Sequence, residues 1–134
     1  MSKERKTLKI VSLVLLAWGI IQVVMAIVRI VGGLDSVTSK TMLGTYAVCA
    51  LASFFTGWAG IQGSNKPSAS PVVVRNSAIV IALIVIALVL WGLFLARDLT
   101  PFVNAAVVSF AAITFVALVA SHVFARKVRA QAER

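Results

Sequence analysis

Few residues in this chain have side chains that could do acid–base, nucleophilic or metal chemistry. The 134 residues include four acids, one histidine and one cysteine. The acids are Glu4, Asp35, Asp98 and Glu133, and all of them fall in predicted loops or tails. No carboxylate is therefore expected inside a membrane span, where it could carry a proton or bind a cation.

His122 and Cys49 lie within long apolar blocks, each without the partner that catalysis needs. No second histidine, acid or cysteine stands near His122, so a hydrogen-bonding or head-group role is expected for it. Cys49 is expected to pack, because a nucleophilic thiol needs a base and a lone cysteine cannot supply a zinc ligand set. The prediction is a protein that is not an enzyme and has no metal or cofactor. An intramembrane enzyme using either residue is a minor alternative.

Uncharged polar residues lie at similar depth in three of the apolar blocks. They are Gln22 in the first block, Ser53 and Thr56 in the second, and Ser109 and Thr114 in the fourth. An amide in hydrocarbon must find a partner, so Gln22 is expected to face the bundle and bond one of these hydroxyls or a carbonyl. The set is either a polar contact between helices or the lining of a narrow pathway.

Arg29 lies about one turn from the end of the first apolar block. Its long stem can reach the external head groups or Asp35, which would make it a membrane anchor. If it turned inward, it would instead form the external mouth of a pathway that attracts anions.

The elements that position these residues are four apolar blocks, at about residues 10 to 31, 41 to 62, 77 to 96 and 102 to 124. Hydrophobic residues make up 60% of the chain and charged residues 13%, which is outside the range of soluble domains. Each block has about 20 residues or more and can cross the roughly 30 Å hydrocarbon core. The sequence therefore predicts one all-α membrane domain over 1–134, a four-transmembrane-helix bundle.

Local signals mark the ends of these spans. Gly32-Gly33 is a helix stop, residues 34 to 40 are predicted to be an external loop, and residues 63 to 76 form a Pro/Ser-rich cytoplasmic linker. Ser70-Pro71 and Thr100-Pro101 each fit a capping residue followed by proline at the first helical position. The spans thus form two helical hairpins. The first apolar run is too long for the core of a signal peptide, so that helix is expected to be retained.

Basic residues give a net charge of +9 and are placed at the block ends. Ten lie in the N-terminus, the linker and the C-terminus, whereas Arg29, Lys40 and Arg97 lie on the other side. The positive-inside rule then puts both termini in the cytoplasm, in a multi-pass protein of the cytoplasmic (inner) membrane. No aromatic residues are interleaved to stack bases, so nucleic acid is not expected as a partner. The basic tail with Arg126, Lys127 and Arg129 is expected to face anionic lipid.

Small residues at helical spacing form possible packing surfaces on two spans. Those of the second span are Ala52, Thr56, Gly57, Gly60 and Ser64, and those of the fourth are Ala105, Ser109, Ala117, Ala120 and Ser121. Two such surfaces exceed what one tight helix pair requires. They favour a homo-oligomer or a membrane protein partner, in addition to contact with membrane lipids.

The segment GWAGIQGSNKPS at 57–68, followed by a second apolar hairpin, resembles a loose group of uncharacterised small bacterial four-helix membrane proteins with no settled activity. The resemblance implies architecture only. Small multidrug transporters are built around a glutamate in the first span, where this chain has Gln22, and the glycine-rich arginine motif of fluoride channels is not recognisable here.

These features together predict a non-enzymatic integral membrane protein that self-associates or serves as the small subunit of a membrane assembly. The alternative is a channel or carrier for an ion or small solute. In that case the polar layer of Gln22, Ser53, Thr56, Ser109 and Thr114 lines the path, and Arg29 stands at its external mouth.

Overall fold

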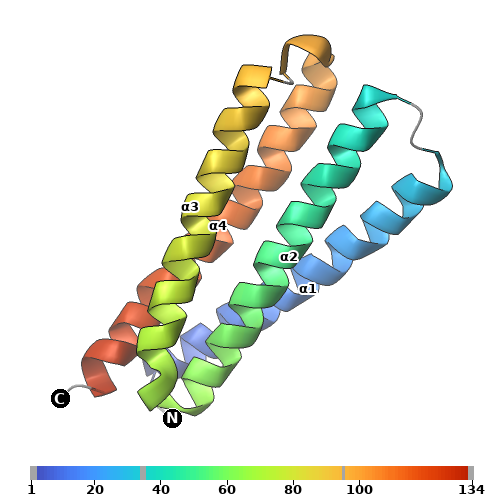
Figure 1. Cartoon of the computed structure of the whole chain (residues 1–134). Helices are drawn as coiled ribbons and strands as arrows, with labels where there is room; N and C mark the ends of the chain where they lie inside the picture. Colours follow the sequence, from blue (N-terminus) through green and yellow to red (C-terminus); the bar gives the residue numbers. More distant parts are fainter. Residues whose placement is uncertain (1–2, 34–35, 95, 133–134) are drawn as a thin grey trace.

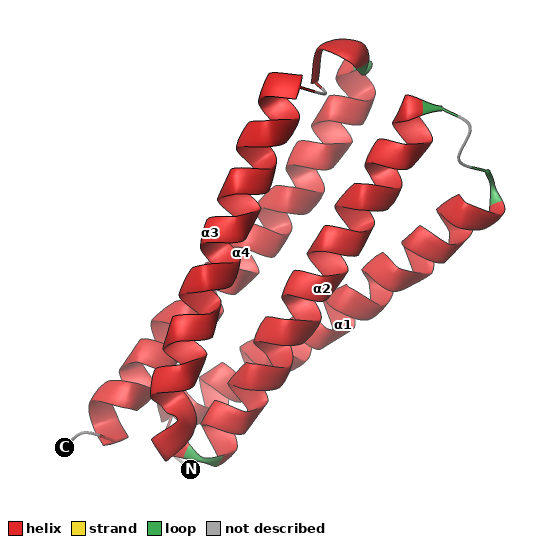
Figure 2. Cartoon of the chain, viewed as in Figure 1, coloured by secondary structure: helices red, strands yellow, loops and turns green. Residues whose placement is uncertain are grey.

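The computed structural model describes residues 3–33, 36–94 and 96–132, which are helical nearly throughout (Figure 2). The elements are α1 (Lys3–Val31), α2 (Val37–Asn65), η1 (Pro67–Ala69), α3 (Ser70–Phe94), η2 (Ala96–Asp98) and α4 (Pro101–Ala132). The shortest of the four long helices, α3, has 25 residues, or about 37 Å at 1.5 Å per residue. All four are long and apolar enough to cross a bilayer, which fits a multi-pass membrane protein.

The connection between α1 and α2 is shorter than predicted. α1 ends next to two glycines, and Gly33 has a φ of 98°, in the left-handed region that glycine adopts without strain. α2 begins at Val37, because the Ser36 hydroxyl accepts a backbone N–H three residues later, at 3.1 Å. The predicted loop over residues 34 to 40 is therefore too long, since its second half is the first turn of α2.

The helices extend beyond the apolar blocks at the other end as well. α2 continues to Asn65 and α3 begins at Ser70, so the predicted linker over residues 63 to 76 is reduced to the four residues between them. α4 continues through the basic tail to Ala132. Apolar blocks mark the part of a helix that can lie in hydrocarbon, whereas its backbone hydrogen bonds can continue into the polar interface.

Figure 1 shows α1 beside α2 and α3 beside α4, with both chain termini at one end of the bundle. We call this the terminal end; it also contains the end of α2 and the start of α3. The turn end is the opposite end, where α1 connects to α2 and α3 to α4. Toward the turn end α1 runs away from α2, whereas α3 and α4 stay side by side (Figure 1).

Buried apolar side chains form three clusters along the bundle. The terminal-end cluster contains Leu8, Ala59, Val73, Ala125 and Val128. The middle cluster contains Leu15, Ala52, Val80, Ile84 and Leu118. The turn-end cluster contains Met42, Tyr46 and Val107. All four helices contribute buried residues to the first two clusters, but only α2 and α4 do so in the third, so the described core is thinnest at the turn end.

Candidate functional site

Glycines bring α2 very close to its neighbours at the terminal end. A Cβ atom added at Gly57 would lie 2.9 Å from the backbone oxygen of Ser12, and one at Gly60 would overlap the Ser12 side chain. At Gly63 the added atom would lie 2.6 Å from Cγ2 of Val73 in α3. The predicted packing groove on α2 therefore contacts α1 and α3 of the same chain.

The remaining members of the two small-residue sets differ in burial. Ala52, Thr56 and Ser64 of α2 are buried inside the chain. In α4, Ser121 is buried and Ala117 and Ala120 are half-buried, while Ala105 and Ser109 are exposed. The α2 set, one of the two on which the prediction of association rested, thus packs within one chain.

The predicted polar layer is only partly assembled. Gln22, Ser53 and Thr56 have 0%, 0% and 1% of their surface exposed. Ser12 faces Gly60 and Gly19 faces Phe54. This antiparallel register places Gln22 at the level of residues 50 and 51.

No hydrogen-bond partner among the described residues is found for either polar atom of the Gln22 amide, or for the hydroxyls of Ser53 and Thr56. The prediction that Gln22 faces the bundle is confirmed. The prediction that it bonds a hydroxyl or carbonyl is wrong for the described residues, because neither its amide nitrogen nor its amide oxygen lies within hydrogen-bond distance of a suitable group there.

The two α4 residues of the predicted layer, Thr114 and Ser109, differ in burial and in hydrogen-bond partners. The indole N–H of Trp18 donates to the Thr114 hydroxyl oxygen at 2.8 Å, and that hydroxyl donates to the Phe110 carbonyl at 2.9 Å. Ser109 is exposed and donates to the Ala105 carbonyl of its own helix at 2.8 Å, so it does not belong to the layer. Trp18 joins the layer instead. The sequence did not identify it, because its depth alone does not show which way the indole points.

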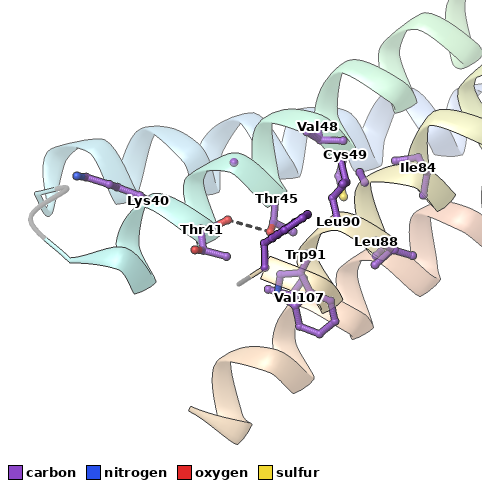
Figure 3. A pocket seen from close by; sticks show the side chains of 14 residues that line it. Lys40, Thr41, Thr45, Val48, Cys49, Ile84, Leu88, Leu90, Trp91 and Val107 are labelled. Carbon is purple, nitrogen blue, oxygen red and sulfur yellow. Dashed lines mark hydrogen bonds between the residues drawn. The ribbon is translucent and has the colours of Figure 1, made fainter. Parts of the chain in front are cut away.

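A cavity lies at the turn end, between α2, α3 and α4. It has a volume of about 710 Å³. Its lining is mostly apolar and includes Val48, Ile84, Leu88, Val107 and Ala111, with Lys40, Thr41 and Thr45 at the outer end of α2 (Figure 3). We call it the α2–α3 groove. Its volume lies in the range of small-molecule sites.

The groove is open toward the outer surface of the bundle. Leu90 and Phe94, which line it from α3, are 50% and 70% exposed. A Cβ atom added at Gly44, which lines it from α2, would meet nothing within 4 Å. The α2 wall repeats at helical spacing, in the pairs 40/41, 44/45 and 48/49. That spacing is visible in the sequence, but nothing there shows that the facing helices stand apart.

Two other predicted residues lie near cavities. Arg29 is half-buried and lines a smaller cavity of about 340 Å³ between α1 and α2, together with Met25 and Tyr46. Its predicted contact with Asp35 lies outside the described residues. Cys49 is 2% exposed and lies in the wall of the α2–α3 groove.

His122 has a partner at the terminal end. Its Nδ1 lies 2.8 Å from the Ser77 hydroxyl, which also lies 3.0 Å from the Val74 carbonyl oxygen. The Ser77 hydroxyl has one proton and can donate it to only one of these two groups. If it donates to the Val74 carbonyl and accepts from a protonated Nδ1 of His122, all three groups are satisfied. This agrees with the predicted hydrogen-bonding role. Among the described residues no three His, Cys, Asp or Glu side chains are grouped so that they could hold a metal.

The basic tail continues α4 as an amphipathic helix. Arg126, Lys127 and Arg129 are exposed, while Ala125 and Val128 pack into the terminal-end cluster. The Lys127 ammonium lies 5.0 Å from the centre of the Phe124 ring. The tail is therefore attached to the bundle, with its basic residues on the surface.

Comparison with known proteins adds no family to this picture. No protein-family model matches the chain, and no curated protein or solved structure matches it at a significant level. The resemblance to the loose group of four-helix membrane proteins remains a prediction.

Proposed function

We propose that this chain is a non-enzymatic multi-pass membrane protein that binds a membrane-dissolved molecule in the α2–α3 groove, as a binding protein or carrier. The observation that supports this is the cavity of about 710 Å³ with apolar walls that reach the outer surface of the bundle. A molecule dissolved in the bilayer can enter such a groove sideways, without crossing water. An apolar wall with a few polar groups at one end is typical of small-molecule sites.

We propose further that the two helix pairs are hairpins in the cytoplasmic (inner) membrane, with both termini in the cytoplasm. The ten basic residues of the terminal side against three on the turn side support this orientation. The groove then opens toward the external leaflet. Single cysteines test it in a Cys49→Ala chain: T100C should react with a membrane-impermeant maleimide in intact cells, and S68C should not. The reverse pattern would refute the orientation.

The binding role is tested by native mass spectrometry of the protein released from nanodiscs. Gly44→Phe should fill the groove, since space is open at that position. Gly92→Phe is the matched control, because a Cβ atom there also meets nothing within 4 Å but Gly92 does not line the groove. Loss of a bound molecule in the first variant and retention in the second is expected. Equal retention in both would overturn the proposal.

The same spectra address the predicted assembly role. A homo-oligomer or a small subunit of a membrane assembly remains a prediction, with the exposed α4 residues Ala105 and Ser109 as the available small-residue surface. A dimer, a larger oligomer or a co-purified protein would support it, and a monomer across protein concentrations would refute self-association. A closed ring would make conductance the next measurement.

A second candidate is a channel or carrier for an ion or small polar solute. It is favoured by the buried amide of Gln22 and the buried hydroxyls of Ser53 and Thr56, none of which has a partner among the described residues. Gln22→Leu tests it. A pathway role predicts altered flux in a folded protein. Without such a role, removing an unpartnered buried amide should raise the free energy of unfolding by about 1 kcal/mol. Unchanged flux would refute the pathway role of Gln22. A loss of stability would show that its amide is hydrogen-bonded in the folded protein.

A further inference from the structure

We propose that the occupant of the α2–α3 groove is an anionic membrane phospholipid, with one acyl chain along the groove and its head group at Lys40. This inference rests on the proposed binding function and specifies its ligand.

The lining of the groove changes from polar to apolar along its length. Lys40, Thr41 and Thr45 line it at the start of α2, and Val48, Ile84 and Leu88 line it farther into the bundle. Figure 3 shows the Lys40 side chain extending away from the apolar lining and from Thr41, with its amino group at the far end. An amphiphile with a polar head at the turn end and an apolar chain toward the middle of the bundle matches this order.

Charge at the polar end favours an anionic head group. Lys40 is exposed, and within the described ranges it makes no ion pair. The Thr45 hydroxyl donates to the Thr41 carbonyl at 2.9 Å (Figure 3), while the Thr41 hydroxyl has no partner in the part of the chain that the structure describes. An ammonium and a hydroxyl at the same end of the groove are both donors to phosphate oxygens of one head group.

The dimensions favour an acyl chain over a helix of another protein. The α2 wall runs from Lys40 to Cys49, about 14 Å along the helix axis at 1.5 Å per residue. A helix about 10 Å wide would occupy roughly 1,000 Å³ over that length. The groove has about 710 Å³, so a helix would remain partly outside it, whereas a single acyl chain is narrower and can lie within it.

The head group, and not the chain, should decide which lipid binds. An acyl chain that moves from the bilayer into the groove leaves one apolar environment for another, so the hydrophobic effect contributes little. A basic residue near an anionic head group contributes a preference of about five-fold. The expected signature is therefore selectivity for head-group charge that depends on Lys40.

Tryptophan quenching by brominated lipids can measure this selectivity at the groove. Trp91 lines the groove, whereas Trp58 is 61% exposed on the bundle surface and reports on bulk lipid. Two full-length chains, each retaining one of these residues with the other tryptophans changed to Phe, are placed in bilayers with brominated phosphatidylglycerol or brominated phosphatidylcholine. Trp91 should be quenched at about five-fold lower mole fraction of the anionic lipid, and Trp58 equally by both.

Variants separate this inference from the proposed function. Lys40→Gln should abolish the anionic preference at Trp91, and Arg97→Gln, at the same end but outside the groove, should keep it. Gly44→Phe should protect Trp91 from both lipids. If Gly44→Phe protects but the two lipids quench equally, or Lys40→Gln keeps the preference, the lipid assignment is overturned and the groove remains a binding site. If Gly44→Phe gives no protection, the binding function itself fails.

Discussion

The terminal and turn halves of the bundle use glycine in opposite ways. In the terminal half, Gly57, Gly60 and Gly63 stand where a Cβ atom would collide with α1 or α3. In the turn half, Gly44 and Gly92 stand where a Cβ atom would meet nothing within 4 Å. The same residue type therefore marks close approach in one half and open space in the other, and the neighbouring helix decides which.

This difference has an energetic reason in a membrane. Lipid is as apolar as a leucine side chain, so helices associate through close packing and hydrogen bonds and not through the hydrophobic effect. The close contacts at the terminal end and in the middle can hold the bundle together. The turn end can then remain apart, and a groove there costs little because lipid can fill it.

The largest expected effect tests the close approach at Gly60. Gly60→Leu should lower the free energy of unfolding by about 3 kcal/mol, because the added side chain must push α1 away from α2. Gly44→Leu on the same helix is the matched control and should change it by less than about 0.5 kcal/mol. Denaturation in mild detergent, followed by circular dichroism, measures both. Equal losses would mean that the two halves are packed alike.

A second test concerns the tie between the N-terminus and the end of α2. Arg5 donates from Nε to the Ser64 carbonyl at 2.8 Å and from Nη2 to the Asn65 carbonyl at 3.2 Å, which caps two carbonyls that a helix end leaves unpaired. Arg5→Gln should cost about 1.5 kcal/mol. Exchange of the amide hydrogens near residue 65 should also become faster. If the exposed control Lys6→Gln had the same effect, net charge and not the cap would explain it.

A smaller effect is expected in the middle of the bundle, where Trp18 bonds Thr114. Trp18→Phe and Thr114→Val each remove this hydrogen bond, and the packing that Trp18→Phe loses by itself cancels in the cycle. A double-mutant cycle in detergent should give a coupling energy of about 0.6 kcal/mol, the average for hydrogen bonds between membrane helices. A coupling near zero would show that the bond does not hold α1 to α4.

The smallest expected effect has the opposite sign. Gly44→Ala and Gly92→Ala add a methyl group to open space and raise helix propensity, so each should stabilise the protein by up to about 0.5 kcal/mol. Gly63→Ala, beside Val73, should destabilise it in the same assay. Destabilisation by Gly44→Ala would show that the turn half closes around this position.

Much of the secondary structure could be predicted from the residues. The four helices, the stop at Gly33 and the start at Pro101 follow from block length, glycine and proline, because each is a local property of the chain. Helix ends were predicted less well. The first turn of α2 and the last turn before Asn65 are polar, and hydropathy does not detect a helix that continues outside the hydrocarbon.

The candidate site was harder to predict. Gln22, Thr114 and Thr56 could be placed at a shared depth, yet depth did not show that Thr114 bonds Trp18 or that Ser109 faces outward. Orientation around a helix axis depends on the neighbours, and periodicity is weak in helices that are apolar on all sides.

The sequence by itself determined that this protein has four helices able to span a membrane, where most of them end, and which few polar groups they carry. These features depend on local composition and on the length needed to cross a bilayer. Only the tertiary structure decided that the α2 glycines pack within the chain and that a groove lies between α2 and α3. It also decided that the Gln22 amide is buried with no hydrogen-bond partner among the described residues. Each of these depends on the distance and rotation between helices, which in an apolar solvent is set by side-chain fit and not by hydropathy.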